Sequence, residues 1–188
     1  KGIDVSVVST GIGCPSTAIA VEELSHIGAE VFIRIGTSGS VDKSAKKGDI
    51  FIATAAVRDD GTSKQYIPIE FPAIASHNVV SSLIKASKDL NIDSKVGICQ
   101  SKDSFFGETE PERMPVAPYL DFKWKSWQQG GVGASEMEAA TLFTLSQIKR
   151  LEAGAILAIE TSDKETIKKM TEIVLESITY MEREKNVS

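Results

Sequence analysis

The chain has 188 residues, of which 41% are hydrophobic and 25% charged, and this composition suits one globular domain with a sizeable core. Its formal net charge of -5 argues against nucleic acid as a main partner, because binding to a phosphate backbone needs a basic face. No apolar run reaches about 18 residues and the chain does not open with a signal peptide, so no membrane span is predicted.

The first half of the chain is predicted to alternate between strands and helices. An apolar run at residues 5–9 is typical of a strand, and it leads into a turn with two glycines. A helix is predicted to begin at Ser16 or Thr17, either of which can cap it, and to end at Gly28. Further strands are predicted at residues 31–35 and 50–57.

The second half continues this alternation around one irregular stretch. Residues 101–120 are predicted to form a long loop, and loops of this length are usually functional or mobile. The regular elements predicted on either side are helices at 78–90, 135–149 and 164 to about 184, and strands at 96–99 and 154–159. Together the elements predict a single three-layer α/β domain. Cys14 and Cys99 show no metal-ligand spacing and are predicted to be reduced thiols of a cytosolic protein.

Two glycine-containing segments have the composition of anion sites. In residues 9–17, Ser-Thr-Gly-Ile-Gly-Cys-Pro-Ser-Thr, glycines between a strand and a helix could cradle a phosphate or could form a tight packing turn. In residues 34–39, Arg-Ile-Gly-Thr-Ser-Gly, an arginine is predicted at a strand's end, just before a glycine-rich turn. A guanidinium and the N–H groups of such a turn suit an anion. The alternative is a buried structural arginine, although no acidic residue is adjacent to Arg34 in the sequence.

Two further segments suit a nucleoside-sized ligand. Residues 103–107, Asp-Ser-Phe-Phe-Gly, carry phenylalanines that could belong to a minor core or could stack on a planar ring. Glu136 and Glu138 flank Met137 at the start of a predicted helix. Carboxylates there can simply favour the helix dipole, or one of them can accept hydrogen bonds from the hydroxyls of a sugar.

Taken together and in this order, these segments resemble the nucleoside phosphorylase-I family. Residues 9–24 look nearly identical to that family's second-strand motif, residues 34–39 match its phosphate segment and residues 135–142 match its ribose-binding helix. Residues 70–73, Glu-Phe-Pro-Ala, resemble the uridine-specific branch. The resemblance covers nearly the whole chain. It implies one domain over residues 1–188, a three-layer α/β/α fold with a mixed, partly barrel-like central sheet.

The resemblance also implies a reaction, the phosphorolysis of uridine, and by extension of deoxyuridine, to uracil and ribose 1-phosphate in pyrimidine salvage. Phosphate would attack the anomeric carbon of the sugar through an oxocarbenium-like transition state, as in glycoside cleavage generally. Inorganic phosphate would be the co-substrate, and no cofactor would be needed. Relatives are cytoplasmic pentosyltransferases that assemble as hexamers built from dimers, so a homo-oligomer is expected.

By the same resemblance, each part of the substrate has its own set of residues. Arg34, Glu138 and Arg113 would form the catalytic set. The phosphate would be held by Arg34 and Thr37, the ribose by Glu136, Met137 and Glu138, and the base by Phe105, Ser38, Gly39, Glu108 and Arg113. Arg113 would donate to a uracil carbonyl and stabilise the departing negative charge. A monovalent cation at a dimer interface would match the Ile12 carbonyl and Ser16; no other metal is expected.

Three departures from the family pattern bear on this interpretation. The chain starts after the family's first strand and its Gly-Asp-Pro phosphate loop, so we expect these segments, with a second phosphate arginine, to lie outside this sequence. The stretch after Ile159 is shorter than the family's usual loop, which closes over the base. Glu108 stands where the family commonly has glutamine, and a carboxylate can accept from uracil N3–H but cannot donate to a carbonyl.

Three alternative functions follow from the same fold. A purine nucleoside phosphorylase is disfavoured by residues 70–73 and by the Pro-Glu-Arg segment at 111–113. A hydrolytic nucleosidase would have no use for a phosphate arginine such as Arg34. A nucleoside-binding paralogue without activity is disfavoured by the intact set of Arg34, Thr37, Met137 and Glu138.

Overall fold

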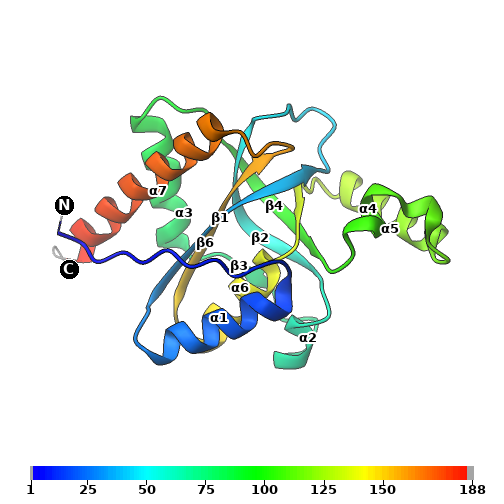
Figure 1. Ribbon diagram of the computed structural model, residues 1–188, viewed down its shortest axis with the longest axis horizontal. Helices are drawn as coiled ribbons and strands as arrows, with labels where there is room; N and C mark the ends of the chain where they lie inside the picture. The colour runs from blue at the N-terminus through cyan, green and yellow to red at the C-terminus, as the bar shows by residue number, and fades with distance from the viewer. Residues whose placement is uncertain (1, 186–188) are drawn as a thin grey trace.

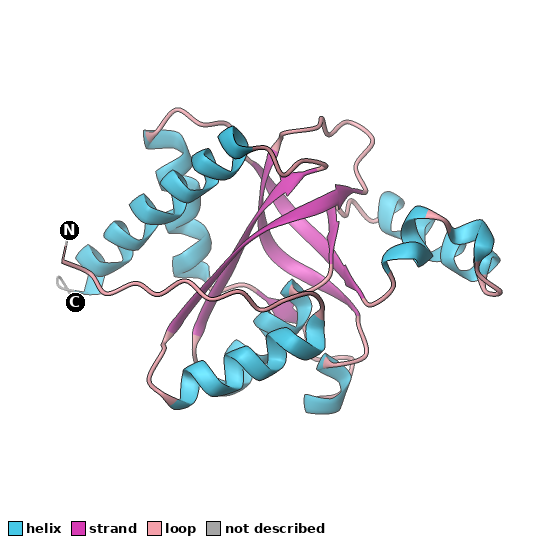
Figure 2. Ribbon diagram, in the orientation of Figure 1, coloured by secondary structure: helices cyan, strands magenta, loops and turns pink. Residues whose placement is uncertain are grey.

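The computed structural model describes residues 2–185, in which a mixed sheet lies between helices (Figures 1 and 2). Its strands are β1 (Val31–Ser40), β2 (Ile50–Asp59), β3 (Ala73–Ile74), β4 (Lys95–Lys102), β5 (Ala134–Glu136) and β6 (Glu152–Ile159). Its helices are α1 (Cys14–His26), α2 (Ser63–Tyr66), α3 (His77–Asp89), α4 (Phe105–Thr109), α5 (Ala117–Gln129), α6 (Ala139–Lys149) and α7 (Lys164–Lys185). A single 3-10 turn, Pro111–Arg113, joins α4 to α5.

The sheet closes on itself into a small barrel. The strand order is β3-β2-β4-β5-β1-β6, and an additional pairing between β2 and β6 completes the ring. β1 runs parallel to β6 from the Val31–Glu152 pair to the Ser38–Ile159 pair, whereas β2 and β6 are antiparallel. The mixed, partly barrel-like sheet expected from the sequence is therefore confirmed.

Alternating side chains of β2 assign the helices to two outer layers. Ile50 and Ile52 belong to one core cluster, which includes residues of α3 and α7. Phe51 and Ala53 belong to the other, which includes residues of α1 and α6. Because successive strand residues point to opposite faces, the sheet is covered on both sides, and the three-layer architecture is confirmed (Figure 1).

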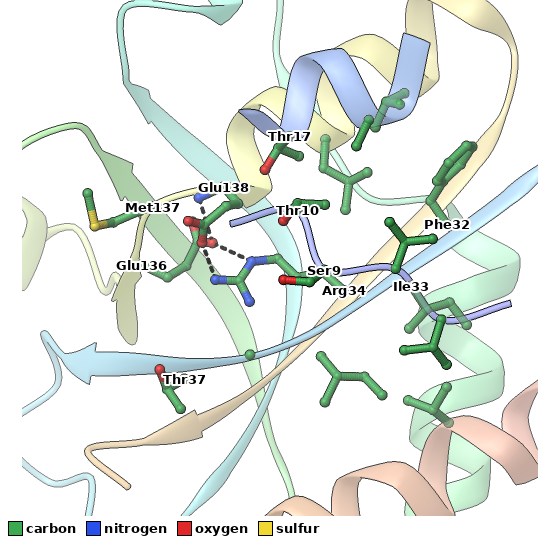
Figure 3. Close-up of a pocket in the computed structure, with 18 of the residues that line it drawn as sticks. Ser9, Thr10, Thr17, Phe32, Ile33, Arg34, Thr37, Glu136, Met137 and Glu138 are labelled. Atoms are coloured by element: carbon green, nitrogen blue, oxygen red, sulfur yellow. Dashed lines mark hydrogen bonds and ion pairs between the residues drawn. The ribbon is translucent and has the colours of Figure 1, made fainter. Parts of the chain in front are cut away.

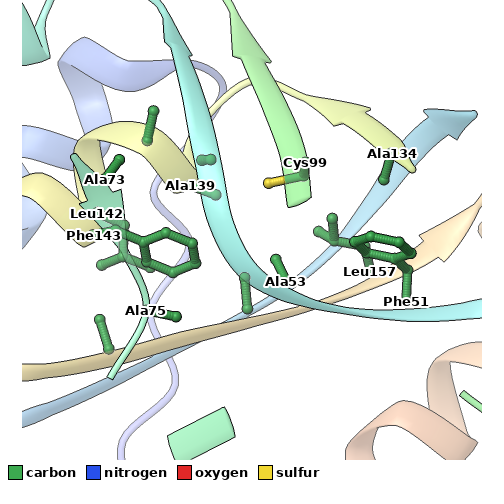
Figure 4. Packing of buried hydrophobic residues seen from close by; sticks show 14 of the residues in the cluster. Phe51, Ala53, Ala73, Ala75, Cys99, Ala134, Ala139, Leu142, Phe143 and Leu157 are labelled. Carbon is green, nitrogen blue, oxygen red and sulfur yellow. The ribbon is translucent and has the colours of Figure 1, made fainter. Parts of the chain in front are cut away.

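The second core cluster is rich in alanine and is built around a few large rings (Figure 4). Glycines make room for the Phe51 ring. A Cβ atom added at Gly133 would lie 2.9 Å from the Cζ atom of Phe51, and one at Gly97 would lie 3.3 Å from the same atom. The close approach of backbone to ring packs β2 against β4 and against the segment that leads into β5.

The predicted strand at residues 5–9 is not present. Residues 2–12 form no ladder and run in a loop from the end of α7 to the start of α1 (Figure 1). Val7 is 96% exposed. The sequence has the β-propensity of a strand, but propensity describes a residue that fits a paired, half-buried surface, and here no described strand pairs with the segment.

Helix α1 begins two or three residues earlier than predicted. Its cap is Gly13, and the hydroxyls of Ser16 and Thr17 each donate to the Gly13 carbonyl at 3.1 Å instead of capping the helix themselves. The predicted end is confirmed, because Gly28 follows the helix with a φ of +100°, a conformation that glycine adopts without strain.

Two segments have a different type of secondary structure from the one predicted. Strand β1 continues through Ser40, so residues 34–39 are strand and not a turn. Helix α6 begins only at Ala139, because Ala134–Glu136 form strand β5, which pairs with both β1 and β4. Glu136 therefore lies in a strand, and Glu138 stands at the N-cap position of the helix without a capping hydrogen bond from its own side chain.

The predicted loop at residues 101–120 is largely regular. β4 continues to Lys102, and α4, the 3-10 turn and α5 follow as an arm that projects from the barrel (Figure 1). Pro111 and Pro118 stand at the first positions of helical turns, where the missing N–H of proline costs nothing. The prolines therefore mark helix starts and not a loop.

The other predicted elements are present, and the short predicted strand at 96–99 extends to Lys95–Lys102. Cys14 and Cys99 are free and buried, as expected for thiols. Among residues 2–185, no helix combines the length and the apolar character needed to cross a bilayer.

Candidate active site

A large open cleft of 1940 Å³ lies beside β1. Its walls are β1 itself, the N-terminal segment 3–12, the junction of β5 and α6, and the start of α4. The cleft collects most of the residues singled out from the sequence: Ile12, Arg34, Thr37, Ser38, Gly39, Phe105, Glu108, Glu136, Met137 and Glu138.

Arg34 lies in this cleft beside two carboxylates, those of Glu136 and Glu138 (Figure 3). Its Nη2 atom donates to the Glu138 carboxylate, and its Nε atom lies 3.0 Å from Oε2 of Glu136. The Nε–H is not directed at that oxygen as a hydrogen bond, so the second contact is an ion pair. The acidic partners that the sequence did not show beside Arg34 therefore come from far along the chain: Glu138 lies 104 residues after Arg34.

Burial and charge oppose each other in this cluster. Burial by itself lowers the pKa of Arg34, but Glu136 and Glu138 more than compensate and raise the pKa above its ordinary value. Burial raises the pKa of Glu136, and the charge of Arg34 opposes that rise. Because Arg34 is already matched by carboxylates, an incoming anion must share the guanidinium or displace Glu138 from it.

Glu138 also ties the first glycine segment to the site. Its Oε1 atom accepts a hydrogen bond of 2.6 Å from the backbone N–H of Gly13. The turn before α1 therefore contributes a backbone donor, as the sequence suggested, but this donor holds a carboxylate of the protein. Of the two roles considered for residues 9–17, the structure shows the tight packing turn.

A second charged cluster lies where Gly39 of β1 pairs with Ser135 of β5. Oε2 of Glu108 accepts from the Ser135 hydroxyl and lies 2.7 Å from Nζ of Lys102. Gly39 leaves space for this carboxylate, because a Cβ atom there would lie 2.7 Å from Oε1 of Glu108. Glu108 is therefore a fixed, paired group and not a solvated loop charge.

Sequence reasoning did not identify Lys102. It is 8% exposed, lines the cleft and donates to the Ser135 hydroxyl at 2.8 Å. The Ser135 hydroxyl also lies 2.6 Å from Oε1 of Gln100, so its single proton is shared between Glu108 and Gln100, and the Gln100 amide donates to Asp59. The signal available in the sequence was a lysine just after a predicted strand, three residues before the first phenylalanine of α4.

Other predicted residues occupy less direct positions. Thr37 is three positions from Arg34 in the same strand, so alternation places their side chains on opposite faces of β1. The Ser38 hydroxyl, on the Arg34 face, is buried and has no hydrogen-bond partner among the described residues. Phe105 is half exposed at the rim of the cleft and meets Phe106 edge to face.

Arg113 does not line the cleft. Its side chain is 64% exposed, forms an ion pair with Glu110, the residue before the same 3-10 turn, and lies over the Phe106 ring at 6.0 Å. A contact between Arg113 and a base in the cleft would require this arm to move.

The two residues matched to a monovalent cation are adjacent. The Ser16 hydroxyl donates to the Ile12 carbonyl at 3.1 Å, and Ile12 itself is exposed. In the part of the chain that the structure describes, no three His, Cys, Asp or Glu side chains are arranged to hold a metal ion.

Comparison with known proteins gives a consistent result. The phosphorylase superfamily matches residues 1–185 of the chain. A uridine phosphorylase of Treponema pallidum is 48% identical over 155 residues, which cover 82% of this chain and 60% of the relative. A uridine phosphorylase of Thermococcus kodakarensis is 46% identical over 161 residues, 85% of this chain and 58% of the relative. A guanosine phosphorylase of Halorubrum lacusprofundi is 41% identical over 159 residues, 85% of this chain and 61% of the relative. The chain thus spans about 60% of the length of the curated relatives that it matches.

Proposed function

The chain belongs to the phosphorylase superfamily, and we propose that it cleaves uridine with inorganic phosphate to give uracil and ribose 1-phosphate. The observation that carries this proposal is the position of Arg34. The guanidinium of Arg34, which is proposed to bind phosphate, donates a hydrogen bond to Glu138, the carboxylate proposed to bind the sugar. The names of the relatives from Treponema and Thermococcus support uridine as the nucleoside.

In the proposed reaction, phosphate binds to Arg34 and takes over the Nη donor that Glu138 uses in the free site. Oε2 of Glu138 is then released to accept from the ribose hydroxyls, and Met137 packs against the sugar. A phosphate oxygen attacks the anomeric carbon, the bond from that carbon to N1 of the base breaks, and the electron pair leaves with uracil. Arg34 contributes proximity and charge stabilisation, because it holds the nucleophile below the sugar.

The base is proposed to lie between the Phe105 ring and the far end of β1. Ser38 offers a buried hydroxyl without a partner. The contacts of Glu108 with Lys102 and Ser135 both use Oε2 and leave Oε1 to accept from an N–H of the base. One acceptor oxygen suits the N3–H of uracil.

A second candidate is a guanosine-cleaving phosphorylase, and the residue that favours it is Glu108. A carboxylate is an acceptor only, and guanine offers two neighbouring donors, N1–H and the exocyclic amine. The relative from Halorubrum is a guanosine phosphorylase. Uridine remains the preferred reading because Oε2 of Glu108 is already taken by Lys102 and Ser135, so only one oxygen is open to a base.

We also propose that the protein works as a homo-oligomer, a dimer-based hexamer by analogy with its family. Support comes from the arm formed by α4 and α5, which carries exposed aromatic side chains at Phe106, Tyr119 and Phe122. Exposed apolar groups gathered on one projection are typical of an interaction surface.

The direct test is incubation of the purified protein with uridine, with and without phosphate, and with guanosine and inosine in parallel. Uracil and ribose 1-phosphate released only in the presence of phosphate are expected. Base release without phosphate would point to a hydrolase, and guanine or hypoxanthine in place of uracil would move the specificity to purines. In Arg34→Ala, we expect the phosphate-dependent rate to be lost while nucleoside binding is largely kept; an unchanged rate would refute the phosphate role.

A further inference from the structure

Glu136 is the most completely engaged carboxylate of the cleft. Its Oε1 atom accepts from the Ser101 hydroxyl and, at 3.0 Å, from the backbone N–H of Ala139. Its Oε2 atom accepts from the backbone N–H groups of Glu138 and Ala139, both at 2.9 Å, and lies 3.0 Å from Nε of Arg34. A carboxylate has about four lone-pair sites, and this one accepts four hydrogen bonds from three donor groups and forms an ion pair with Arg34.

Glu138 differs from Glu136 in both engagement and exposure. The Glu136 side chain has no exposed surface, whereas 10% of the Glu138 side chain is exposed to the cleft. Among residues 2–185, Glu138 accepts only from Gly13 and Arg34, so about half of its lone-pair sites stay open. A sugar hydroxyl entering the cleft therefore finds an acceptor on Glu138 and none on Glu136.

We infer that Glu136 is a positioning residue for the phosphate arginine and not a ligand of the sugar; this inference rests on the phosphate role proposed for Arg34. Glu136 is itself fixed by backbone N–H groups at the start of α6 and by Ser101 of β4. It transfers that rigidity to the Nε edge of the guanidinium. The Nη edge, which reaches Glu138 in the free site, is the part left to bind phosphate.

Glu136 also keeps Arg34 from depending on Glu138 as its single anionic partner. Arg34 without Glu136 would have one strong partner, Glu138, and the whole guanidinium could turn toward it. With Nε held on the other side, phosphate can displace Glu138 without displacing Arg34. The affinity of the site for phosphate should therefore depend on Glu136, and its affinity for the nucleoside should not.

The test compares Glu136→Gln with the wild-type protein in three measurements: the KM for phosphate, the KM for uridine, and the affinity for phosphate alone by calorimetry. We expect the KM and the Kd for phosphate to rise about tenfold, as expected for the loss of one charge-assisted contact, with the KM for uridine within about twofold. Glu136→Asp, which keeps the charge but withdraws it from Nε, should show a smaller change in the same direction and serves if the glutamine variant does not fold.

The matched control is Thr141→Val. Thr141 is a fully buried residue of α6, the helix that follows Glu136, and its hydroxyl donates to Asp60 and not to Glu136. We expect a comparable loss of thermal stability with the phosphate constants unchanged. If the KM for uridine rises in Glu136→Gln and the phosphate constants do not, Glu136 is a sugar ligand and the inference is wrong.

Two other results would also overturn the inference. One is a fall in melting temperature in Glu136→Gln with no change in any binding constant, which would show a purely structural residue. The other is an equal rise of both KM values. Calorimetry with phosphate alone separates this test from that of the proposed function. A wild-type protein that binds phosphate but cleaves no uridine would refute the function and still report on Glu136, whereas one that binds no phosphate would refute both.

Discussion

The guanidinium of Arg34 lies directly over Gly36, two residues further along the same strand. A Cβ atom built on Gly36 would overlap the Nη1 and Cζ atoms of Arg34. Residues two apart in a strand share a face, so the side chain of the first can fold back over the second only if the second has none. The Arg-Ile-Gly order in β1 is therefore a requirement of the site, and the glycine serves close packing and not a turn.

Gly36→Ala should expel Arg34 from its place without altering the strand. The backbone φ of Gly36 is not positive, so alanine fits the strand conformation. The added methyl group must push the guanidinium off Glu136 and Glu138, and we expect the phosphate-dependent rate to fall about 100-fold, with about 1–3 kcal/mol lost from the free energy of unfolding. Steady-state kinetics and urea denaturation measure the two effects.

The same substitution in an Arg34→Ala background isolates the mechanism. If Gly36 acts only through Arg34, the double variant should have the rate of Arg34→Ala alone, because the two changes are fully coupled. Ile35→Ala, on the opposite face of β1, is the control and should leave the rate unchanged. Independent, additive losses would show that Gly36 has a role apart from Arg34.

The sequence predicted which residues belong to the site better than it predicted the contacts between them. Arg34, Met137 and Glu138 could be assigned to one site because their segments, taken in order, resemble those of one family; the composition of each segment alone left a structural alternative open. The hydrogen bond from Gly13 to Glu138 joins residues separated by 125 positions, and the Lys102–Glu108 pair depends on how α4 folds back over the end of β4. Such contacts are set by tertiary packing, which no local pattern encodes.

The errors in secondary structure have the same origin. Glu136 looked like the first turn of a helix because its sequence suits one, but it pairs with Ser101 of β4, and its neighbours in β5 pair with β1, so it belongs to a strand. The strand expected at residues 5–9 lacks such a partner among the described residues and stays a loop. In both cases the presence or absence of a neighbouring strand outweighed local propensity.

Glu108→Gln should change the base preference of the cleft. An amide can accept from uracil N3–H and also donate to a neighbouring carbonyl, whereas the carboxylate can only accept. One added hydrogen bond contributes about 0.5–1.5 kcal/mol, so the ratio of kcat/KM for uridine to that for guanosine should rise about two- to tenfold. The melting temperature should fall, because Lys102 loses its anionic partner.

Glu112→Gln is the matched control for this change. Glu112 is exposed on the nearby 3-10 turn and does not line the cleft. Neither its base preference nor its melting temperature should differ from the wild type. A Glu108→Gln protein with an unaltered uridine-to-guanosine ratio would show that this side chain does not contact the base.

Neither cysteine should react in the folded protein. Cys14 stands at the first position of α1, where a helix dipole favours a thiolate, but burial dominates and raises the pKa of its thiol. Burial likewise raises the pKa of Cys99 well above its ordinary value. Ellman's reagent should label no thiol at pH 8 in buffer and two in urea. As a positive control, Ser81→Cys at an exposed position of α3 should add one thiol that reacts at once. Fast labelling of the wild-type protein would contradict the prediction and would mean that the start of α1 opens.

The last helix depends on the charge of Asp163. Oδ1 of Asp163 accepts from the backbone N–H groups of Glu165 and Thr166, both at 3.0 Å, which caps the start of α7. Hydrogen bonds from Thr166 and Thr161 lower the pKa of this carboxyl below its ordinary value of 3.8. A depressed pKa in the folded state means that the ionised form adds stability above pH 3.8, and that this stability is lost as the pH falls below it.

Asp163→Ala should therefore melt at a lower temperature than the wild type at pH 7, and the difference should narrow as the pH approaches and passes below 3.8. Asp163→Asn separates charge from capping, because an amide oxygen still accepts from the N–H groups of α7 but does not titrate in this range. Its melting temperature should lie between the other two at pH 7, and its advantage over Asp163→Ala should not change with pH, because the amide does not titrate. Thermal denaturation followed by circular dichroism from pH 7 to pH 3.5 measures all three proteins. A difference between wild type and Asp163→Ala that stays constant over this range would show that the cap acts through hydrogen bonding alone and that the charge contributes nothing.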